Sequence, residues 1–118
     1  MGINIHYLEV ITTDLSATCG MLSSVHNVTF SQPEAMLGNA RTADLPDGGR
    51  IGVRLPMAEH EDPIVRPYLR VDVIADAVEG ARKAGAQIAM EPTELPGLGQ
   101  FAIVILAGVQ HGFWQVPG

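Results

Sequence analysis

Cysteine is almost absent from this chain of 118 residues, and aromatic residues make up only 5% of it. The single cysteine, Cys19, cannot form a disulfide within the chain. No set of Cys and His residues has the spacing of a zinc site. We therefore expect a protein of the reducing cytoplasm that contains no structural zinc.

Basic residues are also scarce: the chain has 7 Lys and Arg residues but 13 Asp and Glu residues. Nucleic acids and anionic membranes are bound mainly through clusters of Lys and Arg that neutralise phosphates. The acidic balance argues against both kinds of partner. No uncharged run approaches the length that spans a bilayer, and the N-terminus lacks a charged segment followed by an apolar one. We expect a soluble, cytoplasmic protein.

The most informative feature that is present is an internal repeat. HYLEV at residues 6–10 recurs as PYLRV at 67–71, and at the same offset of 61 positions IGVRLP at 51–56 matches GFWQVP at 112–117. A fixed offset indicates two related units within one chain. With 47% hydrophobic residues, the chain has the composition and length of one globular domain. We predict a single domain, 1–118, with these parts: module one 1–57, a charged linker 58–65 and module two 66–118.

Both modules have the same predicted order of elements. In module one, Asp14 is a natural N-cap for a helix over 15–26, and the Asp47-Gly48-Gly49 stretch favours a hairpin turn. Alternating, β-branched segments predict strands in module one at 3–12, 26–30, 39–45 and 50–56. Module two has a predicted helix over 74–85 that ends at Gly85, and predicted strands at 67–73, 87–92, 100–107 and 111–117. The sequence therefore predicts an α+β fold of two βαβββ modules.

Residues 71–104, VDVIADAVEGARKAGAQIAMEPTELPGLGQFAIV, carry a family resemblance. The segment resembles the second-half signature of the vicinal oxygen chelate superfamily, which includes glyoxalase I, bleomycin resistance proteins and extradiol dioxygenases. The resemblance implies that the two βαβββ modules form a U-shaped sheet cup with the ligand inside and the helices outside. It also implies a homodimer.

The same resemblance implies one divalent metal ion, held by His or Gln on the first strand, Glu on the fourth, His on the fifth and Glu on the eighth. In this chain the fifth-strand position falls on Arg66 and the eighth on Gly112, while the fourth-strand segment 51–56 has no carboxylate. Strict counting places Tyr7 at the first-strand position, one residue from His6. We predict no metal cofactor. The alternative is one divalent ion held by His6 and Glu9.

The face of the first strand follows from its apolar side. Leu8 and Val10 belong against the helix, so Tyr7 and Glu9 are expected to point into the cup and His6 away from it. The repeat makes Tyr68 equivalent to Tyr7, and Trp114 is predicted to face the same interior. These three aromatic side chains either clamp a flat ligand or simply fill the space.

Four charged residues complete the predicted ligand site. Glu9 is the candidate catalytic base and Arg70 the candidate anchor for a substrate carboxylate, unless the two only neutralise each other. Arg54 and Arg66 are expected to add to the preference for an anion, although exposed strand arginines are common. Gly112 is expected to leave an empty space beside Trp114.

These observations predict a glyoxalase-like protein that binds a small, anionic organic molecule without the family metal. It is either a metal-independent enzyme or a binding protein. The alternatives are a metal-dependent lyase or dioxygenase, and a protein that sequesters a drug or toxin, as the resemblance to bleomycin resistance proteins implies.

Overall fold

The computed structural model describes residues 2–46 and 48–118, so Asp47 of the predicted turn lies outside the described residues. The chain divides into two compact units. The first unit contains Tyr7–Val65, and the second contains Met1–His6 together with Arg66–Gly118. Each unit has its own α-helix and its own apolar core.

The described residues of the first unit form three strands, one α-helix and one 3-10 helix. Its elements are β1 (Ile5–Ile11), which enters the unit at Tyr7, α1 (Leu15–His26), η1 (Ala35–Leu37), β2 (Arg41–Asp44) and β3 (Arg50–Arg54). The strand order is β2-β3-β1, with β1 parallel and β2 antiparallel to β3. As predicted, the side chain of Asp14 caps α1 by accepting a hydrogen bond from Ala17 N at 3.0 Å.

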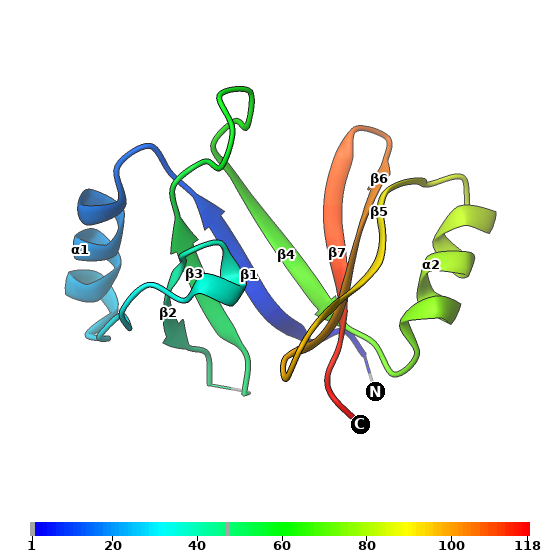
Figure 1. Ribbon diagram of the computed structural model, residues 1–118, viewed down its shortest axis with the longest axis horizontal. Coiled ribbons are helices and arrows are strands. Elements are labelled where there is room, and N and C mark those ends of the chain that lie inside the picture. The colour runs from blue at the N-terminus through cyan, green and yellow to red at the C-terminus, as the bar shows by residue number, and fades with distance from the viewer. Residues whose placement is uncertain (1, 47) are drawn as a thin grey trace. The chain divides into compact units, whose positions relative to one another are not determined.

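Helix α1 covers one face of this sheet (Figure 1). The buried residues between them are Cys19, Phe30, Ala43 and Val53. Val10 packs against this cluster. Tyr7 and Glu9 alternate with Val10 along β1, so they are buried on the opposite face of the strand. The predicted placement of Tyr7 and Glu9 on the side of β1 opposite to Val10 is therefore confirmed.

One predicted strand of module one is wrong. Residues 26–30 form no strand: His26 ends α1, and Asn27 turns the chain with a left-handed backbone, φ 54°. Phe30 then enters the core, and Ser31 binds Thr42 through both backbone and side chain. Pro33 follows, and because it has no N–H to donate, a regular ladder does not develop there.

The second unit has the predicted βαβββ order. Its elements are β4 (Ile64–Arg70), α2 (Ile74–Lys83), β5 (Gln87–Leu95), β6 (Gly99–Leu106) and β7 (Val109–Gln115). The strand order is β4-β7-β6-β5, with β4 parallel to β7 and antiparallel pairs elsewhere. Helix α2 lies against this sheet (Figure 1), and its buried Ile74 and Val78 pack with Ala102. The predicted α+β fold class is thus confirmed.

The first strand of this unit departs from its predicted bounds at both ends. Strand β4 starts at Ile64, inside the predicted linker 58–65, and ends at Arg70 rather than at residue 73. Val71 leaves the strand and packs with the core under α2. The predicted helix stop is confirmed, because Gly85 follows the C-cap with φ 98°.

A tyrosine of the first strand lies over a glycine of the last strand in each unit. In the first unit, a Cβ atom built on Gly52 would lie 1.7 Å from the hydroxyl oxygen of Tyr7. In the second unit, a Cβ atom on Gly112 would lie 2.1 Å from Cδ2 of Tyr68. Both tyrosines are buried, so only a residue without a side chain fits beneath them.

These registers correct the predicted match between the last strands. Tyr7 pairs with Arg50, whereas Tyr68 pairs with Gly112, so β3 and β7 correspond at an offset of 62 rather than 61. The faces agree with this offset, because Val53 packs under α1 while Trp114 lies on the face opposite α2. One residue of slip in a strand reverses the face of every side chain.

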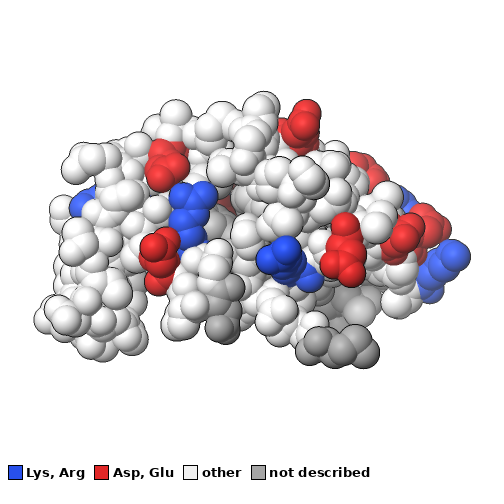
Figure 2. Space-filling model, turned by 90° about the horizontal axis from the view of Figure 1, so that it is seen from below, with Lys and Arg blue, Asp and Glu red and all other residues white. Residues whose placement is uncertain are grey.

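Neither helix among the described residues is long and apolar enough to cross a membrane. On the surface seen in Figure 2, the Lys and Arg side chains are separated from one another by other residues.

We predict that Gly112→Ala destabilises the protein by about 1–3 kcal/mol, because the added methyl group collides with the buried ring of Tyr68. Gly80→Ala is the matched control: Gly80 lies within α2 and has no atom within 4 Å of a built Cβ. That substitution is expected to stabilise by about 0.5–1 kcal/mol. Urea denaturation of the two variants measures both changes, and equal stabilities would contradict the close packing of Tyr68 on Gly112.

Candidate functional site

The polar group of the first unit is centred on Arg54, the last residue of β3. Its Nε donates to Oε2 of Glu9 at 2.8 Å, and its two terminal nitrogens donate to the two carboxylate oxygens of Glu61, each at 2.8 Å. The guanidinium also reaches the carbonyl oxygen of Leu55 at 3.1 Å. Only 2% of Arg54 is exposed, so this cation is buried between two carboxylates.

These contacts keep Arg54 charged. The hydrogen bonds to Glu61 and then to Glu9 raise the pKa of Arg54 above its ordinary value, against the opposing effect of burial. The prediction that Glu9 and Arg54 belong to one polar face is consistent with this geometry. Glu61 was missed, because it lies in the charged stretch predicted as a linker, where nothing in the pattern distinguishes it from its acidic neighbours.

The structure gives Glu9 a cationic partner other than the predicted Arg70. The hypothesis of a Glu9–Arg70 pair is replaced by the Glu9–Arg54 ion pair, with 2.8 Å between Oε2 and Nε. Arg70 is exposed at the end of β4, where it pairs in register with Trp114.

The polar group of the second unit is centred on Arg66 in β4. Its Nε donates to the hydroxyl oxygen of Tyr68 at 3.2 Å, and Nη1 donates to Oε1 of Gln110 at 2.6 Å. The guanidinium carbon lies 5.9 Å from the centre of the Tyr68 ring. Arg66 is 9% exposed, and these contacts fix the plane of its guanidinium on the face opposite α2.

An aromatic cluster lies beside this group. The ring of Trp114 stacks on Phe101, with centroids 6.1 Å apart, and meets Tyr68 edge to face at 5.7 Å. The indole N–H donates to the carbonyl oxygen of Leu98 at 2.9 Å, and the His6 ring lies 5.4 Å from Trp114. Phe101 was missed as a member, although it pairs with Trp114 across β6 and β7.

Gly112 does not leave the empty space that its position in the sequence suggested. The ring of Tyr68 occupies the volume above it. His111, on the other side of β7, instead contacts Phe113 at 5.2 Å, and Phe113 belongs to the core under α2. Tyr68 also accepts the hydrogen bond from Arg66, so it belongs to both the aromatic cluster and the Arg66 group.

The divalent ion implied by the family resemblance does not fit these side chains. Its expected positions hold Tyr7, Arg66 and Gly112, which offer a phenol, a permanent cation and no side chain. His6 and Glu9 are three residues apart in β1, so their side chains leave the strand on opposite sides. Among residues 2–46 and 48–118, no group of three or more His, Cys, Asp and Glu side chains is placed to hold a metal ion.

Comparisons with known proteins identify the fold. No protein-family profile matches the chain, and no curated protein matches it in sequence. Among solved structures, a hypothetical protein from Bacillus halodurans C-125 matches with a TM-score of 0.78 and 12% identity, over 100% of this chain and 97% of that one. Methylmalonyl-CoA epimerase from Mycobacterium tuberculosis matches with a TM-score of 0.75 and 12% identity, over 97% and 88% of the two chains.

The epimerase from Streptomyces coelicolor, in complex with 2-nitronate-propionyl-CoA, matches with a TM-score of 0.68 and 15% identity, over 97% of both chains. Methylmalonyl-CoA epimerase has a vicinal oxygen chelate fold. The chain therefore has the α+β fold of the vicinal oxygen chelate and glyoxalase-like proteins.

Proposed function

We propose that the protein binds a small organic anion without a metal ion, with Arg66 as the anchor for the negative charge. The observation that carries the proposal is the fixed guanidinium of Arg66, held by Tyr68 and Gln110 at the position where the resemblance implies a metal ligand. An arginine there provides a permanent positive charge in place of the ion.

The chemistry of arginine supports an anionic ligand. A guanidinium presents five N–H groups in one plane, a geometry that matches the two oxygens of a carboxylate or phosphate. The hydrogen bonds of Arg66 to Tyr68 and Gln110 orient this plane in advance, which lowers the entropy lost when a ligand binds. A charge-assisted pair at a buried position is also stronger than the same pair in water.

The aromatic cluster supports an organic rather than an inorganic anion. Tyr68, Phe101 and Trp114 place three rings on the face that carries Arg66. Ligand sites typically combine apolar and aromatic surface with a few polar groups that fix orientation. The likeness to the epimerases supports the fold alone, so the choice of ligand rests on these residues.

Binding is favoured over catalysis by the environment of Glu9. Its Oε2 accepts a hydrogen bond from Nε of Arg54 at 2.8 Å, so this oxygen is directed at a partner within the first unit. A general base must instead direct its oxygen at the proton that it removes from the substrate. We assign Glu9 to the polar group of the first unit rather than to proton transfer.

The proposal predicts that Arg66→Gln weakens binding of benzoate about tenfold or more, because a charge-assisted hydrogen bond contributes roughly 1.5–3 kcal/mol. Isothermal titration calorimetry with benzoate measures this change, with benzamide as the uncharged probe. Arg82→Gln is the matched control, since Arg82 is an arginine on the outer surface of α2 paired with Glu91. Equal affinities for benzoate in the two variants would refute the anchor, as would equal binding of benzoate and benzamide by the wild-type protein.

A second prediction separates binding from catalysis. Glu9→Gln is expected to lower stability by about 1–3 kcal/mol, because Arg54 loses one of its two carboxylate partners. The affinity for benzoate at Arg66 is expected to stay unchanged. Thermal unfolding and calorimetry check both statements. A variant that binds a substrate normally but loses its turnover would instead identify Glu9 as a base.

A further inference from the structure

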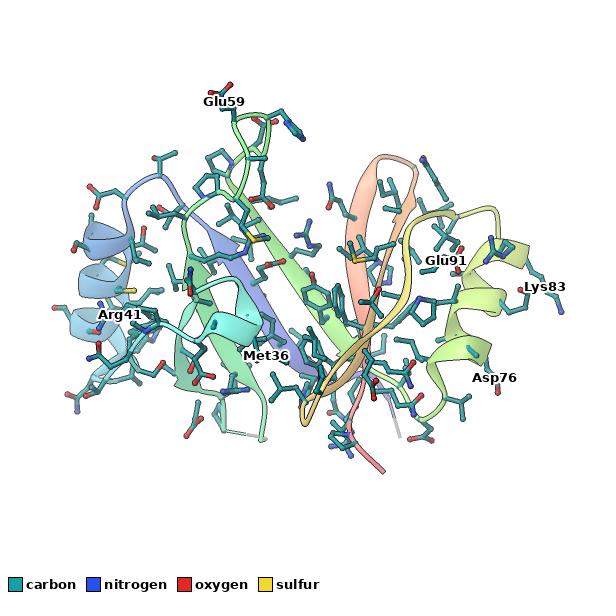
Figure 3. All side chains as sticks on the ribbon, viewed as in Figure 1. Met36, Arg41, Glu59, Asp76, Lys83 and Glu91 are labelled. Carbon is teal, nitrogen blue, oxygen red and sulfur yellow. The ribbon has the colours of Figure 1, made fainter. Side chains whose placement is uncertain are left out.

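The carboxylate of Glu61 binds the loop between β3 and β4 to the first unit. We call residues 57–63, which follow Pro56 and end with Pro63, the strap. Met57 in the strap is 68% exposed, and Figure 3 shows Glu59 at the tip of this loop. Glu61 turns back to Arg54, and its Oε1 also accepts a hydrogen bond from the backbone nitrogen of Met57 at 2.7 Å.

The two carboxylates on Arg54 have different roles. Glu9 projects from β1, its side chain is 10% exposed, and it accepts a hydrogen bond from Nε of the guanidinium. Glu61 projects from the strap, its side chain is 23% exposed, and it meets both terminal nitrogens at once. This two-point contact is the geometry in which arginine binds the carboxylate of a ligand.

The charges make Glu61 the exchangeable partner. One guanidinium is neutralised by one carboxylate, and Glu9 supplies that carboxylate from a strand. Removal of Glu61 therefore leaves Arg54 paired, which differs from the loss of a sole partner from a buried ion pair. The place of Glu61 can be taken by another carboxylate without a change in the net charge of the group.

The surroundings of Arg54 support such an exchange. A Cβ atom built on Gly38 would lie 3.1 Å from Cδ of Arg54 and 3.1 Å from Sδ of Met57. Gly38 has a left-handed backbone, φ 67°, so glycine is favoured there and the arginine stem packs directly against its backbone. The aliphatic stem of Arg54 thus packs against the backbone of Gly38, while the strap covers the end of the guanidinium that meets Glu61.

We propose that Arg54 is a carboxylate-binding site occupied by the chain's own Glu61, and that an external carboxylate binds there by displacing Glu61 and the strap. The exchange forms one pair of N–H···O bonds as it breaks another, and Glu61 moves into water. This site lies in the first unit and uses none of the residues of the Arg66 site. The two proposals can therefore fail separately.

Chemical rescue tests the proposal. Glu61→Ala is expected to unfold at a lower temperature than the wild-type protein, and sodium acetate is expected to recover most of that difference with a saturable dependence on concentration. Acetamide, and sodium chloride at equal ionic strength, are expected to have no such effect. For the same degree of acetate binding at Arg54, the wild-type protein is expected to need at least about tenfold more acetate than Glu61→Ala. The reason is that the tethered Glu61 competes for Arg54 with an effective concentration in the millimolar range or above.

Two further variants complete the experiment. Glu59→Ala removes an acidic residue of the same strap and serves as the matched control without rescue. Glu61→Gln keeps the size of the side chain, so it tests acetate binding if the alanine variant does not fold. Amide exchange gives an independent readout, since the N–H of Met57 is expected to exchange faster once Glu61 is displaced by acetate. Equal effects of acetate on the Glu59 and Glu61 variants, or no effect on either Glu61 variant, would overturn the proposal.

Discussion

The packing of a tyrosine ring on a glycine constrains the approach of the first and last strands of each unit. Tyr7 lies over Gly52, and Tyr68 lies over Gly112. Strand alternation then assigns the faces, because Val10 and Phe113 turn toward the helices and their apolar cores. The strand pair that carries each tyrosine also carries the polar group of its unit, with Arg54 bound to Glu9 and Arg66 bound to Gln110.

A buried arginine lies at the centre of the polar group in each unit. Arg54 is buried between Glu9 and Glu61, and Arg66 is oriented by Tyr68 and Gln110. A guanidinium is a permanent, planar cation, unlike a metal ion, which a chelator can remove. Under the proposed function, these arginines are the groups that receive anionic ligands.

The repeat and the alternation of single strands predicted the fold class, the two helices and the face of Tyr7. They failed where a contact between residues distant in the sequence determines the local structure. Residues 26–30 have the composition of a strand, but the side chain of Phe30 is used by the core and the backbone turns at Asn27. Residues 58–63 of the strap were predicted as part of a charged linker, since the ion pair between Glu61 and Arg54 depends on the folded path of the chain. Phe101 was missed for the same reason, because it meets Trp114 only across a strand pair.

The ring of Tyr68 above Gly112 also limits how this protein can change in evolution. The resemblance places a metal-binding carboxylate at residue 112, yet even a methyl group there would meet the ring at 2.1 Å. A glutamate at 112 needs Tyr68 to be replaced first, and replacing Tyr68 removes a hydrogen bond from Arg66. A substitution that makes room for a carboxylate at residue 112 thus disturbs the Arg66 group. Acquiring that carboxylate takes several coupled substitutions, and the order in which they occur matters.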